Sequence, residues 1–138
     1  MIVALDHIAI AVPDLQKAIK RFLEDFGLRY EGTEDVPSAK TSTAFFPLPE
    51  TSIELVHPLN GEGPIAGYLE KKGGGLHHLC FRTDDIHADV ARLKEKGYQF
   101  LSEAPGPGAH NCTVIFIHPK SCDGVLIELS QPAGDGHH

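Results

Sequence analysis

The chain contains two copies of one sequence pattern, and this repeat constrains its fold more than any other feature. Residues 6–15 resemble residues 77–86, and His7 and His78 occupy the same place in the two copies, 71 positions apart (78 − 7). Matched strands, helices and glycines follow one another in the same order, which indicates two copies of one module. Further matched positions are Asp14 and Asp85, Ile19 and Val90, Phe22 and Leu93, Gly27 and Gly97, and Glu54 and Glu128.

Each copy reads as a strand, a helix and three further strands. In the first copy an apolar, β-branched run at 2–12 predicts a strand, and Asp14 then caps a helix that ends at Gly27. Apolar side chains recur on one face of that helix, which predicts that they are buried; they are Leu15, Ile19, Phe22 and Phe26. The other predicted strands are 28–34, 41–46 and 52–57 in the first copy and 77–83, 98–101, 113–118 and 124–129 in the second, with a helix at 85–96.

These elements predict an α+β protein in which two tandem βαβββ modules form a single domain over residues 1–135. Module one is about 2–60, a linker helix is about 63–73, and module two is about 75–131. The stretch 105–109 is rich in proline and glycine and has no equivalent in module one. Such loops often cover functional sites.

The balance of charges and cysteines excludes several classes of protein. Twelve Lys and Arg residues against nineteen Asp and Glu residues give a net charge of −7, which disfavours nucleic acids and anionic membranes as partners. No apolar run approaches the ~18 residues of a membrane span. Cys80, Cys112 and Cys122 form no CxxC pair, which argues against a disulfide framework and favours the cytoplasm, or the mitochondrial matrix if a presequence has been removed. Of the nine histidines, His137 and His138 read as a terminal tail.

The repeat singles out four side chains of the types that commonly ligate metal ions: His7, Glu54, His78 and Glu128. Each histidine lies on the first strand of its module and each glutamate on the last. If those strands are neighbours, the two side chains of a pair point to the same side of the sheet. Two nitrogen and two oxygen donors without a thiolate suit a divalent transition ion whose remaining positions are open to water or substrate.

Four further stretches of the chain are distinctive: DHIAIAV at 6–12, ELVHPL at 54–59, GLHH at 75–78 and HPKS at 118–121. They resemble the methylmalonyl-CoA epimerases, which belong to the vicinal oxygen chelate (glyoxalase-like) superfamily, and the resemblance covers about 5–131. It implies one glyoxalase-like domain with a metal site in the cleft of curved mixed sheets, a homodimer, and an acyl-CoA substrate of propionate metabolism. It also implies a divalent ion on the same four side chains, Co²⁺ foremost, with Mn²⁺, Ni²⁺, Zn²⁺ or Fe²⁺ as alternatives.

The reaction that this resemblance implies removes the proton α to a thioester, stabilises the enolate with the metal and returns a proton to the opposite face. Glu128 is the first base that we expect, because the family shares this position. Glu54 is the expected second base, because it is the repeat equivalent of Glu128. Some relatives carry a further acid upstream of the Glu54 strand, whereas this chain has no Asp or Glu between Asp35 and Glu50.

A polyanionic CoA substrate requires local cations in a chain whose net charge is −7. Lys120 and Ser121 in the HPKS stretch are the candidate substrate contacts, with Lys40 and residues 71–72 as further cations.

Three alternative functions remain open at this point. Glyoxalase I has a similar His-Glu-His-Glu set, although its usual Asp-Pro-Asp-Gly stretch is replaced here by HPKSCDG. An extradiol dioxygenase would use a triad of His7, His78 and Glu128 for iron. A ligand-sequestering protein on the same fold would need no metal.

Overall fold

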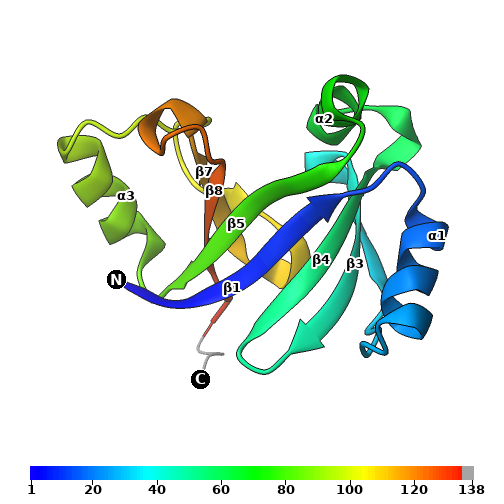
Figure 1. Ribbon diagram of the computed structural model, residues 1–138. Helices are drawn as coiled ribbons and strands as arrows, with labels where there is room; N and C mark the ends of the chain where they lie inside the picture. The colour runs from blue at the N-terminus through cyan, green and yellow to red at the C-terminus, as the bar shows by residue number, and fades with distance from the viewer. Residues whose placement is uncertain (135–138) are drawn as a thin grey trace. The chain divides into compact units, whose positions relative to one another are not determined.

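The computed structural model describes residues 1–134, so the predicted tail at His137 and His138 lies outside the described residues. The chain divides into two compact units. One is His7–His77, and the other is Met1–Asp6 together with the residues from His78 onward. Figure 1 shows the strands and helices of both units. No helix among residues 1–134 is long and apolar enough to cross a lipid bilayer.

The His7–His77 unit contains a sheet with the strand order β2-β3-β4-β1. The strands β2, β3 and β4 pair antiparallel, whereas β1 runs parallel to β4. A parallel neighbour requires a crossover connection, which here includes the helix α1. The elements are β1 (Ile2–Ala11, from His7 on in this unit), α1 (Leu15–Lys20), β2 (Thr33–Val36), β3 (Thr41–Leu48), β4 (Thr51–Pro58) and α2 (Pro64–Lys72), with short 3₁₀ turns at Pro37–Ala39 and Leu59–Gly61.

The helix α1 lies beside β3 and β4 (Figure 1) and starts where the sequence predicts. The Asp14 side chain accepts a hydrogen bond from a backbone N–H of the first turn at 3.0 Å, which satisfies one of the free donors of a helix start. Ala18 and Ile19 pack against Phe46 and Leu55, two side chains that are fully buried. This apolar layer holds the helix on one face of the sheet.

The prediction that Phe26 belongs to this buried layer is wrong. Behind α1 the chain forms a π-helical turn, Arg21–Asp25, in which the Phe26 N–H donates to the Arg21 carbonyl at 3.1 Å. A π turn holds an extra residue and so rotates the next side chains around the axis. Phe22 still packs on Phe46, whereas Phe26 is 59% exposed.

The predicted strand at 28–34 is displaced to β2, Thr33–Val36. Gly32 has a φ of 107°, which a regular strand does not accommodate. The residues before it make isolated contacts with β3 instead, such as the Glu31 N–H donating to the Phe45 carbonyl at 2.8 Å. The strand β2 therefore begins at Thr33, later than the predicted start at 28.

The opposite face of this sheet carries α2, the helix that the sequence predicts at 63–73. Its Ile65 packs against Ala9, Ala11 and Val56. The residue Gly74 follows the helix with a φ of 138°, and a Cβ atom added there would lie 3.2 Å from the Ala11 carbonyl oxygen. Only glycine fits this close approach without strain.

The second unit contains a sheet with the order β5-β8-β7-β6. The strand β5 is parallel to β8, while β8, β7 and β6 are antiparallel. Asp85 caps the crossover helix by accepting from the Ala88 N–H at 3.1 Å. The elements are β5 (Gly75–Thr83, from His78 on in this unit), α3 (Ile86–Glu95), β6 (Gly106–Pro107), β7 (Thr113–Ile117) and β8 (Ile127–Gln131), with 3₁₀ turns at Ala109–Asn111 and Pro119–Ser121. The core under α3 is Ile86, Val90, Ile115, Ile117 and Leu129.

Two strand predictions and one loop prediction in this unit need correction. The predicted strand at 98–101 is reduced to a single bridge between Phe100 and Ile117. The last strand begins at Ile127 rather than at 124, because the Val125 N–H closes a turn to the Cys122 carbonyl at 3.0 Å. The stretch 105–109 contains the two-residue strand β6, although the sequence predicts only a loop there.

Both units place the first and last strands of their module side by side and parallel: β1 with β4, and β5 with β8. This arrangement decides where the histidine and the glutamate of each module lie.

Candidate active site

In the first module His7 and Glu54 form a close pair. Glu54 is directly opposite Ala9 in the β1–β4 pairing, so it shares a face with Ala9 and with His7, two residues earlier on the same strand. The His7 Nδ1 atom lies 3.1 Å from Oε2 of Glu54. The two side chains are only 8% and 13% exposed, so the carboxylate orients an imidazole that is largely shielded from water.

In the second module His78 and Glu128 form the same kind of pair. Glu128 is directly opposite Cys80, two residues after His78. The His78 Nε2 atom lies 3.0 Å from Oε1 of Glu128, and the side chains are 8% and 10% exposed. The two modules differ in one respect, because His7 presents Nδ1 to its carboxylate and His78 presents Nε2.

An aromatic ring also stands at the matching place in both modules. Phe45 is directly opposite Glu54 across β3 and β4, and Phe116 is directly opposite Glu128 across β7 and β8. The Phe116 ring lies 5.1 Å from the His78 ring at an angle of 87°, an edge-to-face contact. Sequence reasoning missed both rings, although their separation is again 71 residues (116 − 45).

Each unit therefore supplies one imidazole and one carboxylate, all four largely buried. Burial of such groups is costly unless each is paired with another charge, a donor or a metal ion. The donor set, two nitrogens and two oxygens without thiolate, fits a divalent transition ion such as Co²⁺, Mn²⁺, Ni²⁺, Zn²⁺ or Fe²⁺.

The HPKS stretch forms a tight, hydrogen-bonded turn in the second unit. The His118 Nδ1 atom accepts from the Lys120 N–H at 3.0 Å and so caps the 3₁₀ turn Pro119–Ser121. The Ser121 hydroxyl oxygen accepts from the Gln99 N–H at 3.0 Å, which leaves its own proton free to donate. Lys120 is exposed, so its ammonium group is open to an anionic ligand.

Two further histidines outside the candidate pairs have structural contacts. His57 is half-buried, and its Nδ1 lies 2.9 Å from the Val12 carbonyl oxygen. The His77 ring packs edge-to-face on Tyr68 at 4.9 Å. Both contacts hold the ends of β1 and β5 within the first unit.

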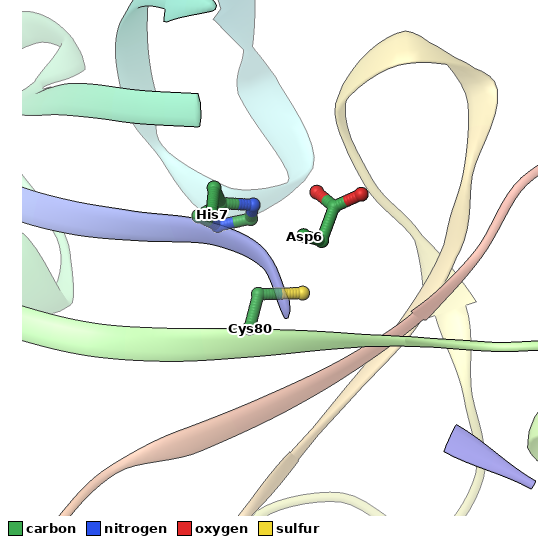
Figure 2. Close-up of side chains that lie close together, drawn as sticks. All are labelled: Asp6, His7 and Cys80. Carbon is green, nitrogen blue, oxygen red and sulfur yellow. The ribbon is translucent and has the colours of Figure 1, made fainter. Parts of the chain in front are cut away.

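Asp6 and Cys80 lie close together in the second unit, from β1 and β5 (Figure 2). A carboxylate oxygen of Asp6 and the Cys80 sulfur lie within 4.8 Å of each other. The Arg82 Nε donates to Oδ1 of Asp6 at 3.0 Å, so this carboxylate is engaged in an ion pair. Cys80 is fully buried, in agreement with a reduced cysteine of structural character.

Comparison with known proteins places these features in a family. The model of the glyoxalase/bleomycin resistance protein/dioxygenase superfamily matches residues 6–116. The human protein named methylmalonyl-CoA epimerase, mitochondrial, is 47% identical over 128 residues, which are 92% of this chain and 73% of the human one. A Cereibacter sphaeroides protein named ethylmalonyl-CoA/methylmalonyl-CoA epimerase is 46% identical over 133 residues, 95% of this chain and 99% of that one.

A solved structure gives the same result for the fold. The methylmalonyl-CoA epimerase of Mycobacterium tuberculosis is 35% identical, covers 96% of this chain and 90% of its own, and superimposes with a TM-score of 0.92. The predicted fold class is confirmed: an α+β fold of two βαβββ modules, which the repeat indicates, in a glyoxalase-like domain, which the family resemblance implies.

Proposed function

The chain belongs to the methylmalonyl-CoA epimerases of the glyoxalase superfamily, a family of isomerases, and we propose that it interconverts the R and S epimers of methylmalonyl-CoA. The observation that carries this proposal is the histidine–glutamate pair that recurs on matched strands of both modules, at 3.1 Å and 3.0 Å. A ligand-sequestering protein has no need for two such buried pairs.

The two pairs together hold one divalent ion in this proposal, with His7, Glu54, His78 and Glu128 as ligands. Co²⁺ is the first ion to test, followed by Mn²⁺, Ni²⁺, Zn²⁺ and Fe²⁺. When bound, such an ion acts as a Lewis acid for the negative charge that develops on the substrate oxygens. Four protein donors leave positions for those oxygens.

Epimerisation needs a proton-transfer group on each face of the substrate α-carbon. Glu128 removes or returns the proton on one face. A carboxylate of the first module serves the other face, and Glu54 is the candidate that the repeat symmetry favours. If Glu54→Gln binds metal and turns over at nearly the wild-type rate, Glu54 is a ligand alone.

The acyl-CoA substrate needs cations and donors at its anionic groups. The exposed Lys120 and the Ser121 hydroxyl lie on one short turn, and they supply these contacts in a chain with a net charge of −7. We expect the protein to act as a homodimer in propionate metabolism. We expect it in the cytoplasm, or in the mitochondrial matrix of a eukaryote.

One assay tests the activity directly. The protein is loaded with Co²⁺ and incubated with a single epimer of methylmalonyl-CoA in deuterated water, while inversion and deuterium uptake at the α-carbon are followed. We expect both, and loss of both after chelation of the metal. Absence of exchange, with turnover of the methylglyoxal–glutathione adduct instead, would establish glyoxalase I as the function.

A further inference from the structure

The first-module sheet carries a second acid on the face of the candidate site. Residues that lie directly opposite each other on neighbouring strands share a face of the sheet. Glu34 on β2 is opposite Thr43 on β3, Thr43 is opposite Val56 on β4, and Val56 is opposite Ala11 on β1. Val56 is two residues from Glu54 on β4, and Ala11 is four residues from His7 on β1, so each points to the same face as its partner. Glu34 therefore shares a face with the His7–Glu54 pair.

The neighbouring acid on β2 faces the other way. Asp35 is opposite Ser42, whose hydroxyl donates to its carboxylate at 2.6 Å, so it is held on the α1 face. Glu34 is half-buried, whereas Asp35 is exposed. Among the residues of the four strands in this unit, Glu34 and Glu54 are the two acids on the face that carries His7.

The two acids on this face are separated by about two strands. Glu34 lies two strands away from Glu54 and two residues further along the sheet. At ~4.8 Å between strands and ~3.4 Å per residue, the two Cα atoms are about 12 Å apart. This separation places Glu34 outside the His7–Glu54 pair, on the same face of the sheet.

The repeat does not account for Glu34. In the second module the matching row runs from Gly106 on β6 to Val114 on β7 and Ser130 on β8, without a carboxylate. Glu128 is the single acid in the described strands β5 to β8. The second module therefore has one carboxylate for ligand and base, while the first has two.

We infer that Glu34 is the proton-transfer group on the first-module face and that Glu54 remains a metal ligand; this inference rests on the proposed function. The Glu34 carboxylate takes the α-proton, and the electron pair of the broken C–H bond enters the enolate. The carboxylic acid of Glu128 then donates its proton to the opposite face of the same carbon. Glu34 returns its proton to water, Glu128 takes one up, and the roles reverse for the other epimer.

The test compares Glu34→Gln with Asp35→Asn, which makes the same change of charge one residue along on the other face. Both are loaded with Co²⁺ and given each epimer separately in deuterated water. For Glu34→Gln we expect inversion to fall 100-fold or more. Deuterium should still exchange into the epimer whose α-proton faces Glu128, with retention of configuration, and not into the other. Asp35→Asn should stay within about threefold of wild type, and Glu34→Asp should recover part of the inversion.

Two measurements make the result unambiguous. Co²⁺ affinity by calorimetry and the melting temperature should be unchanged in Glu34→Gln, which separates loss of proton transfer from loss of metal or fold. Inversion at the wild-type rate, or equal loss of exchange from both epimers, would overturn the role of Glu34. Failure of the wild-type protein to epimerise would instead overturn the proposed function.

Discussion

Replacing Phe116 by leucine removes an aromatic edge from one candidate ligand pair and leaves the sheet in place. The ring lies edge-to-face on His78 at 5.1 Å, and the residue is directly opposite Glu128. Leucine keeps much of the volume, so the main loss is the aromatic contact, worth about 0.5–1.5 kcal/mol. This contact holds the His78 imidazole in its orientation beside Glu128. Its loss should therefore raise the dissociation constant of Co²⁺ roughly 2- to 13-fold.

Calorimetric titration with CoCl₂ measures this effect, and Phe100→Leu is the matched control. Phe100 packs against the core of the same unit, away from the His78–Glu128 pair. Both variants should lose a similar amount of stability in urea, about 1 kcal/mol. Only Phe116→Leu should weaken metal binding. An unchanged affinity in Phe116→Leu, or an equal loss in both variants, would refute the link between ring and ligand.

Three further predictions concern the HPKS turn at 118–121 and the two units. Lys120→Ala should raise KM for methylmalonyl-CoA about tenfold with little change in kcat, whereas Lys96→Ala should change neither; equal KM values would remove Lys120 from the site. Replacing Asp89 by alanine should lower the free energy of unfolding by about 2 kcal/mol at pH 7, as measured in urea, because this buried carboxylate accepts a hydrogen bond from the Thr83 hydroxyl. Burial opposes the ionisation of Asp89, but its hydrogen bonds outweigh burial and hold its pKa below the ordinary 3.8. The loss of stability in the alanine variant should therefore persist at every pH above 3.8 and fade as the pH falls below that value. Gly74→Ala should destabilise the fold by about 1–3 kcal/mol, and an unchanged urea midpoint would contradict the strain inferred at its φ of 138°.

The repeat makes the candidate pairs predictable from the amino-acid sequence. Equal positions in two copies select His7 with Glu54, because a module that begins and ends with neighbouring parallel strands brings those positions together. The same offset of 71 also connects Phe45 with Phe116 (116 − 45). A phenylalanine in a strand is usually a packing residue, so the sequence alone does not indicate a functional role for this pair.

Other features depend on local geometry that apolar patterns do not encode. The π turn after α1 moves Phe26 from the predicted core to the surface. The face of Glu34 depends on the register between β2 and β3, and a shift of one residue would put Asp35 on the site face instead. Gly32 delays the start of β2, so alternation in 28–34 does not reveal that register.

The division of β1 between the two units has a consequence for cutting the chain. Met1–Asp6 belongs to the unit of the second module, where Asp6 binds Arg82 at 3.0 Å and the Thr83 hydroxyl lies 3.1 Å from the Met1 carbonyl. A break in the connection between the modules separates the two sequence copies but leaves the second fragment without its first strand segment. Fragments cut there should regain structure only when mixed. The boundary between the two sequence copies therefore does not coincide with the boundary between the two compact units.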